Sequence, residues 1–359
     1  MKFFNITGSG NPKNHYMLPA TMRLDAVVLD RLIAQQACFV VYGPPKSGKS
    51  TTMAEFAWQL TKSEAYSAVL VSLEAGSAFP DDIGSAENAI LRDWKQTIRF
   101  QLPKELQPTQ WESTAGPGGR ISEFLSNWSQ EASRPLVVLM DDTDALTHKV
   151  LFSILPQLRS GFNRRPTGFP SSIVLIGLRD VHNYKIHPSN SPHLNRTVPF
   201  NIVAHSFALR NFNLKEVNSL LHQHTEETGQ VFTHEALAHV FELSQGHPWL
   251  VNALAKICVE ELVPDIAESV EIEHVETAKE TIIQRRQTYL DHITDKLQDD
   301  DIRNVIEPIL AEQILVLVPP DDREYAIDLG LVRRVNGGGL TIDNPIFKEV
   351  TLCELAGDF

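Results

Sequence analysis

The chain has 359 residues, of which 42% are hydrophobic and 21% charged, and a formal net charge of −13. This length allows two or three domains, and the composition is that of an ordinary globular protein. The acidic balance argues against a surface that binds nucleic acid nonspecifically as a whole, because phosphate contacts need clustered Lys and Arg; a local basic patch stays open. No apolar run approaches the roughly 18 residues of a membrane span.

The N-terminal residues and the cysteines bear on the location of the protein. Residues 1–6 are mostly apolar, but polar residues follow at once in 7–14, so we expect no signal peptide. The three cysteines, Cys38, Cys258 and Cys353, are far apart and fit neither a disulfide framework nor a zinc site. We therefore expect a cytoplasmic protein that does not enter a membrane.

The first half of the chain has the pattern of an open α/β sheet. Residues 1–36 form an N-terminal lead-in that becomes helical in its second part, and residues 37–205 alternate apolar strands with helices. The expected strands are continuous runs rich in Val, Ile and Leu, as in a parallel sheet covered on both faces, at 39–42, 68–73, 136–140 and 173–177. Helical patterns lie between them, around 86–101, 121–131 and 149–160.

The second half of the chain is mainly helical. Residues 206–265 predict a helical region, in which each helix follows a start signal, at 214–226, 233–244 and 249–263. Residues 266–359 predict further helices to 318, a short helix at 324–329, a strand at 331–335, a turn at 336–339 and a returning strand at 340–342. Helices followed by a β-hairpin are the outline of a winged helix. The sequence thus predicts a parallel-sheet core, a helical region and a C-terminal winged-helix-like domain.

One motif dominates the core. Residues 43–50, Gly43-Pro44-Pro45-Lys46-Ser47-Gly48-Lys49-Ser50, match G-x-x-x-x-G-K-[ST], the phosphate-binding loop of nucleoside triphosphatases. The apolar run 38–42 precedes the motif, and an amphipathic helix follows it. The alternative is an ordinary Gly-rich turn, which the strand before the motif and the helix after it make the less favoured interpretation.

The loop motif carries a specific chemistry. Its glycines let several backbone N–H groups point at one phosphate, and the start of the following helix adds a positive dipole end. Lys49 would reach the β- and γ-phosphates, and Ser50 would hold Mg²⁺. We therefore expect ATP and Mg²⁺ as cofactors, with residues from Gly43 to Thr51 in contact with the nucleotide.

Two carboxylates end the apolar run at 136–140. Because ligands sit at the carboxyl ends of parallel strands, Asp141 would face the nucleotide and hold Mg²⁺. Asp142 is the natural candidate for the general base that polarises the attacking water. The alternative is a pair of solvated acids at a strand end.

A cation follows the next apolar strand. Arg179 would lie at the same sheet edge, where it could contact the γ-phosphate. The alternative is a structural salt bridge to Asp142 or Asp180.

Together these residues resemble AAA-like ATPases of the STAND and related clades, and are most similar to a group of prokaryotic AAA-like ATP-binding proteins. The likeness extends over nearly the whole chain. Besides the phosphate loop it rests on residues 4–8, 15–19, 136–146, 177–181, 246–252, 328–332 and 343–346.

The resemblance assigns further roles. It implies that residues 206–265 are a helical lid, in which Gly246 and Pro248 start a helix beside the nucleotide. It also implies that Arg179 is a sensor of the phosphates. The segment containing His15, Tyr16, Leu18 and Pro19 would pass the adenine ring. Without the family, that segment is equally well a packed entry loop.

The chain also departs from its relatives. Many of them have Glu at the position of Asp142. The middle of the loop is Pro44-Pro45-Lys46-Ser47 where Arg or Gln is expected, and Lys46 adds an extra cation beside the phosphates. In oligomeric relatives an arginine between the two acidic strand ends completes the neighbouring subunit's site. Here Arg159, Arg164 or Arg165 would take that role, or belong to a solvated loop.

The resemblance implies an ATPase that binds and slowly hydrolyses ATP. The output would be a switch, or an ATP-dependent homo-oligomer, that acts on a separate partner protein. Prokaryotic defence or mobile-element biology is a setting by analogy only. Two alternatives stay open: a DNA-loading ATPase that uses Arg333 and Arg334 beside the hairpin, and a nonhydrolysing nucleotide-gated scaffold.

Overall fold

The computed structural model describes residues 1–180, 185–186, 196–197, 200–285, 288–312, 318–335 and 338–357. The chain divides into two compact units. We call Ala20–Tyr42 with Lys49–Leu209 the sheet unit, and Met1–Pro19, Gly43–Gly48 and Arg210–Phe359 the helical unit. The phosphate-loop motif straddles this division, since Gly48 and Lys49 belong to different units. The expected boundary at 205 falls inside a strand, and the four-part division stays a prediction.

The sheet unit is built on five parallel strands in the order β2-β3-β4-β1-β7. The strands are β1 (Cys38–Tyr42), β2 (Ser67–Ser72), β3 (Leu136–Asp141), β4 (Ser172–Gly177) and β7 (Val203–Ala208). The four predicted strands and the α/β class are confirmed. β7 was not predicted, because this edge strand is only partly buried and contains His205 and Ser206, so no continuous apolar run marks it.

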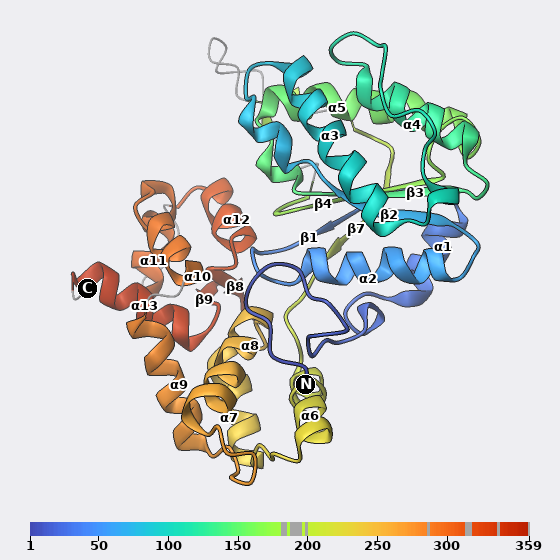
Figure 1. The fold of residues 1–359 in the computed structure, drawn as a ribbon. Helices are drawn as coiled ribbons and strands as arrows, with labels where there is room; N and C mark the ends of the chain where they lie inside the picture. The colour runs from blue at the N-terminus through green and yellow to red at the C-terminus, as the bar shows by residue number, and fades with distance from the viewer. Residues whose placement is uncertain are drawn as a thin grey trace. The chain divides into compact units, whose positions relative to one another are not determined.

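Helices cover both faces of this sheet (Figure 1). Successive residues of β1 point to opposite faces, with Val40 in one core and Phe39 in the other. The first core receives Trp94 and Trp128. It is covered by α3 (Ile83–Gln101), α4 (Arg120–Glu131) and α5 (His148–Gly161). The second is covered by α1 (Ala26–Ala34) and α2 (Lys49–Lys62).

The lid region has the predicted helix starts. The helices are α6 (Leu214–Thr228), α7 (His234–Ser244) and α8 (Pro248–Ile257), which continues as a π-helical turn, Cys258–Leu262. Asn213 caps α6 in a capping box with Glu216, and the Thr233 side chain caps α7 by accepting from Ala236 N–H. The start signals are confirmed, because short polar side chains satisfy the first N–H groups of a helix.

The C-terminal region contains helices around a small hairpin. The helices are α9 (Ile272–Gln284), α10 (Thr288–Lys296), α11 (Asp300–Leu310), α12 (Pro320–Asp328) and α13 (Pro345–Ala356). The hairpin pairs β8 (Val332–Arg334) with β9 (Leu340–Ile342), as predicted, although 336–337 of the expected turn and 313–317 of the expected helix lie outside the described residues. α13 was not predicted, despite its Asn344 cap and first-turn Pro345. The winged-helix assignment stays a prediction.

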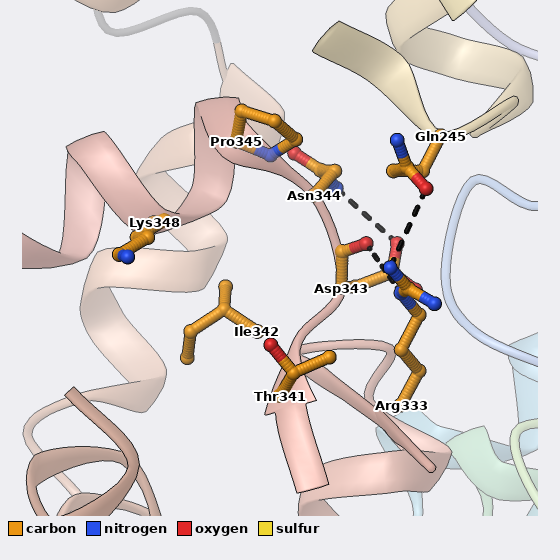
Figure 2. Close-up of a pocket in the computed structure, with 8 residues that line it drawn as sticks. All are labelled: Gln245, Arg333, Thr341, Ile342, Asp343, Asn344, Pro345 and Lys348. Atoms are coloured by element: carbon orange, nitrogen blue, oxygen red, sulfur yellow. Dashed lines mark hydrogen bonds between the residues drawn. The ribbon is translucent and has the colours of Figure 1, made fainter. Parts of the chain in front are cut away.

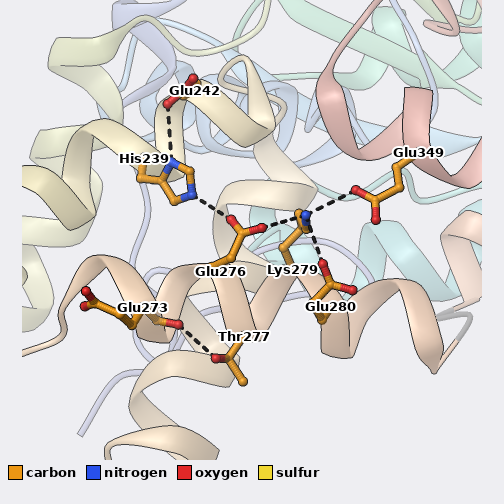
Figure 3. A network of polar contacts seen from close by, with 8 residues as sticks. All are labelled: His239, Glu242, Glu273, Glu276, Thr277, Lys279, Glu280 and Glu349. Carbon is orange, nitrogen blue, oxygen red and sulfur yellow. Dashed lines mark hydrogen bonds and ion pairs between the residues drawn. The ribbon is translucent and has the colours of Figure 1, made fainter.

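A charged network joins three helices of the helical unit (Figure 3). Lys279 of α9 lies 2.7 Å from Glu276, 3.0 Å from Glu280 and 3.2 Å from Glu349 of α13. His239 of α7 lies 2.8 Å from Glu276. The Lys279 ammonium therefore connects α13 to α9 through its ion pair with Glu349. Within the described residues, every helix is too short or too polar to cross a membrane.

Candidate functional site

Three adjacent strand ends carry the predicted site residues of the sheet unit. β4 lies between β3 and β1, and all three run parallel. β1 leads into the phosphate-loop motif, β3 ends at Asp141, and Arg179 follows the last residue of β4 by two positions. Sequence and topology thus bring these features to one edge of the sheet, where open α/β sheets bind ligands.

Lys49, the first residue of α2, lies among carboxylates. Burial lowers the pKa of its ammonium, while the charges of Asp144, Asp141 and Asp142 oppose that shift. Asp144 was not predicted. Its Oδ1 accepts a 2.8 Å hydrogen bond from Leu178 N–H, which holds the turn after β3 against the end of β4. The only sequence signal was a third acid beside the strand-end pair.

Asp141 is a buried carboxylate beside Ser50. It is 6% exposed, and burial together with the charge of Asp142 raises its pKa to about 6. The Ser50 hydroxyl and the N–H of Asp142, at 2.9 Å, donate hydrogen bonds to it. A hydroxyl at the start of a helix beside a carboxylate at the end of a strand suits Mg²⁺, which takes oxygen ligands. The described side chains contain no group of three His, Cys, Asp or Glu that could hold a metal, so phosphate and water oxygens would have to complete the coordination.

Asp142 is held in a specific orientation. Its backbone is left-handed, with φ 59° and ψ 39°. Ser72, the last residue of β2, donates from Oγ to Oδ2 of Asp142 at 2.7 Å. Ser72 is itself fixed, since its Oγ accepts from Glu74 N–H at 2.9 Å and its carbonyl accepts from the Trp94 indole at 2.7 Å. Sequence reasoning missed Ser72, because only the strand order shows that β2 neighbours β3.

Gly177 lets the acidic turn pack against β4. A Cβ at this position would lie 2.2 Å from Thr143 Oγ1. The Thr143 hydroxyl donates to the carbonyl of Ile176 at 3.0 Å. The close approach of Thr143 to the backbone therefore requires glycine and fixes the turn that carries Asp141, Asp142 and Asp144.

The first six residues of the motif, Gly43–Gly48, belong to the helical unit. Lys46 and Gly48 have positive φ angles of 58° and 83°, and Ser47 N–H donates to the Pro44 carbonyl at 3.3 Å. The backbone curls as a phosphate loop requires. The side chain of Lys46 is exposed.

The predicted adenine segment is packed within the helical unit. Tyr16 is 3% exposed, its ring lies 4.8 Å from that of Phe4, and its hydroxyl is 3.2 Å from His224 Nδ1. The neighbouring His15 packs against Phe3 at 4.6 Å. This arrangement agrees with the packed entry loop. Nucleotide contacts from His15, Tyr16, Leu18 and Pro19 stay a prediction.

The two predicted lid residues shape the start of α8. Gly246 has a φ of 72°, and a Cβ there would lie 1.8 Å from the Phe212 carbonyl oxygen, so only glycine fits. Pro248 occupies the first turn of α8. Both have a structural role, and their contact with a nucleotide stays a prediction.

Three of the remaining arginines have contacts inside their own units. Arg165 donates from Nε to the Phe162 carbonyl at 2.6 Å and interacts with Cys38, at the amino end of β1, the edge opposite the site. Arg334 pairs with Glu324, and Arg333 donates to the Asp343 carbonyl at 3.1 Å. These contacts do not favour DNA binding by Arg333 and Arg334. A role in trans for Arg159, Arg164 or Arg165 stays a prediction.

A cavity of about 390 Å³ lies in the helical unit, between the hairpin and α13 (Figure 2). Arg333 and Lys348 line it together with the buried carboxylate of Asp343, whose pKa is raised by burial. Asn344 and Asn211 donate to this carboxylate at 3.2 and 3.4 Å. The mixed charges do not select one class of ligand.

Comparison with known proteins supports the fold. No family model and no curated protein matches the sequence. Among solved structures, the chain is similar to the Walker-type ATPase paby2304 of Pyrococcus abyssi, with 13% identity and a TM-score of 0.63 over 97% of this chain and 99% of that one.

Two other solved structures are similar to this chain at lower TM-scores. The Thermotoga maritima RuvB Holliday junction branch migration motor has 13% identity and a TM-score of 0.47 over 92% of both chains. The Aeropyrum pernix Orc1 protein in complex with DNA has 14% identity and a TM-score of 0.45 over 96% of this chain and 95% of that one.

The likeness to the Pyrococcus protein, with its TM-score of 0.63, shows that this chain has the fold of a P-loop nucleoside triphosphatase.

Proposed function

We propose that this protein binds ATP with Mg²⁺ and hydrolyses it slowly. The observation that carries the proposal is Lys49, whose ammonium lies among Asp141, Asp142 and Asp144 beside the hydrogen-bonded Ser50. Lys49 and Ser50 are the last two residues of a complete phosphate-loop motif, which comes directly after β1 at the carboxyl edge of a parallel sheet. The fold shared with the Pyrococcus abyssi Walker-type ATPase supports the same function.

The chain's own cations would bind the phosphates. The backbone N–H groups of the loop and the start of α2 favour an anion. Lys49 adds a cation; burial lowers its pKa, and the three carboxylates oppose that shift by favouring the charged form. Arg179 follows the central strand of the three and would face the terminal phosphate.

The Ser50 hydroxyl and the Asp141 carboxylate would hold Mg²⁺. The metal would neutralise charge on the phosphate oxygens. Asp141 suits this role because its ionised form is destabilised by burial and by Asp142, and a cation removes that penalty.

Asp142 would orient the attacking water and accept its proton. The hydrogen bond from Ser72 fixes one carboxylate oxygen, Oδ2. Its partner oxygen would then act as the base. Asp is one methylene shorter than Glu, so we expect modest rates.

Two variants separate turnover from binding. Asp142→Asn keeps the shape but removes the base, and we expect it to lower the hydrolysis rate at least about 100-fold while ATP still binds. Lys49→Ala should abolish binding as well. If Asp142→Asn hydrolyses ATP at the wild-type rate, Asp142 is not the base. If the wild type and Asp142→Asn both bind ATP but neither hydrolyses it, the nonhydrolysing scaffold is the better description.

We also propose that nucleotide state is passed to a separate partner or to a second copy of this chain. The grouping of the phosphate loop with the helical unit supports this proposal. Mass photometry with and without ATP tests the second copy: a larger particle with ATP favours assembly, and an unchanged mass favours a monomeric switch.

A further inference from the structure

The phosphate loop contacts the C-terminal region of the helical unit. Two loop residues, Pro44 and Pro45, contact Gly330, which follows α12, and Tyr289 of α10. All four belong to the same compact unit. The motif itself gives no sign of this, because Tyr289 is 244 positions from Pro45.

Tyr289 contacts the loop through its hydroxyl. The hydroxyl donates to the Pro45 carbonyl at 3.2 Å and lies 3.2 Å from His247 Nε2. A phenol has one hydrogen, so if it donates to Pro45 it must accept from His247. Tyr289 is 3% exposed, and burial, with a smaller contribution from Asp343, raises the pKa of its phenol far above the usual range. The side chain therefore stays a neutral donor.

The ring of Tyr289 is held by other rings. It stacks on His247 with centroids 5.3 Å apart and an angle of 21° between the planes. Trp249 lies 5.2 Å away and Phe347, from α13, 6.0 Å away. A side chain so packed has few rotamers available, so its hydroxyl is a fixed point rather than a mobile one.

Gly330 provides the second contact. Its φ is 72°, and a Cβ there would lie 2.6 Å from Pro44 Cβ and 2.8 Å from Pro44 Cγ. Its N–H donates to the Ile327 carbonyl at 2.9 Å, which fixes Gly330 at the end of α12. The proline ring thus rests directly on backbone that has no side chain.

We propose that Tyr289 and Gly330 are positioning residues that hold the phosphate loop in its nucleotide-binding shape. In a trans peptide the C=O and the following N–H point in opposite directions. Anchoring the Pro45 carbonyl to Tyr289 therefore turns the Lys46 N–H away from that anchor, in keeping with the left-handed φ of 58° at Lys46. A loop held this way needs less ordering when a phosphate binds, so release of the nucleotide is slower.

This inference rests on the proposed nucleotide binding and adds the residues that control it. Because Tyr289 lies on α10 and Gly330 follows α12, movement of those helices would change their contacts with the loop. The rate of nucleotide release would then depend on the position of the C-terminal helices, through the Tyr289 hydroxyl and Gly330.

Release of a fluorescent ADP analogue, measured by stopped-flow displacement, tests the inference. Tyr289→Phe removes only the hydroxyl, and we expect it to speed release roughly three- to tenfold, as loss of one hydrogen bond predicts. Gly330→Ala pushes a methyl group against Pro44 and should speed release at least as much.

Gly357→Ala is the matched control. Gly357 has the same φ of 72°, but a Cβ there meets nothing within 4 Å. It imposes the same backbone strain without touching the loop, so release should match the wild type.

Three outcomes decide the matter. Faster release from Tyr289→Phe and Gly330→Ala, but not from Gly357→Ala, supports the inference. Unchanged or slower release from both overturns it, even if the melting temperature falls, since that result describes packing alone. If the wild type binds the analogue no better than Lys49→Ala, the proposed function itself has failed.

Discussion

Ser72 donates a hydrogen bond of 2.7 Å from its hydroxyl to Oδ2 of Asp142. The bond joins the ends of two neighbouring strands, β2 and β3, at the edge that carries the proposed ATPase site. It gives Asp142 a defined orientation that the chain sequence alone does not specify.

Removing this bond should slow hydrolysis without weakening binding. We expect Ser72→Ala to lower kcat roughly three- to tenfold with KM nearly unchanged. The reason is that the hydrogen bond that orients Asp142, which contributes about 1 kcal/mol, is lost. Steady-state phosphate release measures both constants. Ser85→Ala removes a hydroxyl that also donates to a carboxylate, Asp82, at 2.7 Å, but at an exposed site. A Ser72→Ala enzyme as active as Ser85→Ala would show that the bond does not serve catalysis.

Asp141 should make the stability of the nucleotide-free protein depend on pH. Its folded pKa of about 6 lies above the ordinary 3.8, so the folded state binds the proton more tightly. The resulting stabilisation is complete below about pH 4 and is lost as the pH rises through about 6. Asp141→Asn should therefore raise the free energy of unfolding at pH 7.5 by up to about 3 kcal/mol, and by little at pH 4.

Urea unfolding at the two pH values checks this expectation. Asp81→Asn, which alters a side chain that is 91% exposed, is the control and should change stability little at either pH. An Asp141→Asn protein that is less stable than the wild type at pH 7.5 would mean that the carboxylate is not strained by burial.

A methyl group at Gly177 should disturb the acidic turn. The new Cβ would lie 2.2 Å from Thr143 Oγ1, so the turn must shift. We expect Gly177→Ala to cost about 1–3 kcal/mol of unfolding free energy and to reduce ATP hydrolysis with it. Gly116→Ala, where a Cβ meets nothing within 4 Å, should change stability by less than about 0.5 kcal/mol. Equal denaturant midpoints for the two variants would contradict the tight packing at Gly177.

Lys279 should stabilise the helical unit, because its positive charge attracts three carboxylates that would otherwise repel one another. Burial lowers the pKa of Lys279, but Glu276, Glu280 and Glu349 outweigh this and raise it; the pKa of Glu276 is lowered first by Lys279 and then by His239. Since the Glu276 pKa is depressed, its stabilisation is present above about pH 4.5 and is lost on acidification. Lys279→Met should cost about 1–2 kcal/mol at neutral pH, and less at pH 4.

Circular dichroism during urea unfolding, at neutral pH and at pH 4, measures the Lys279 contribution. Lys256→Met is a fitting control, since the ion pair of Lys256 is with Glu260, four residues further along the chain, and does not join two separate helices. Similar losses from the two substitutions would argue against a network effect around Lys279.

The parts of the fold that sequence could predict are those with a local signal. β1, β3 and β4 are continuous apolar runs because both faces of the sheet are covered. The helix starts at Asn213 and Thr233 depend on side chains that bond to N–H groups within three residues. By contrast, β7 at the sheet edge lacks the apolar run.

The parts of the site that sequence missed depend on long-range neighbours. Ser72 became relevant only through the pairing of β2 with β3, and Asp144 only through the bend that returns it to Leu178. Tyr289 sits in an ordinary helical pattern, and nothing local connects it with Pro45. The phosphate loop, Asp141 and Asp142 could be predicted because each belongs to a recognisable pattern of contiguous residues.

Isothermal titration calorimetry can measure ATP binding with Mg²⁺ at the phosphate loop. We expect the wild type to bind ATP in Mg²⁺ with micromolar affinity or better, and Lys49→Ala to lose this binding. Chelating Mg²⁺ should weaken ATP binding to the wild type more than to Asp141→Asn, in which one metal ligand is already impaired. If the wild type gives no heat of binding, or if Lys49→Ala binds ATP equally well, ATP does not bind at this loop as proposed.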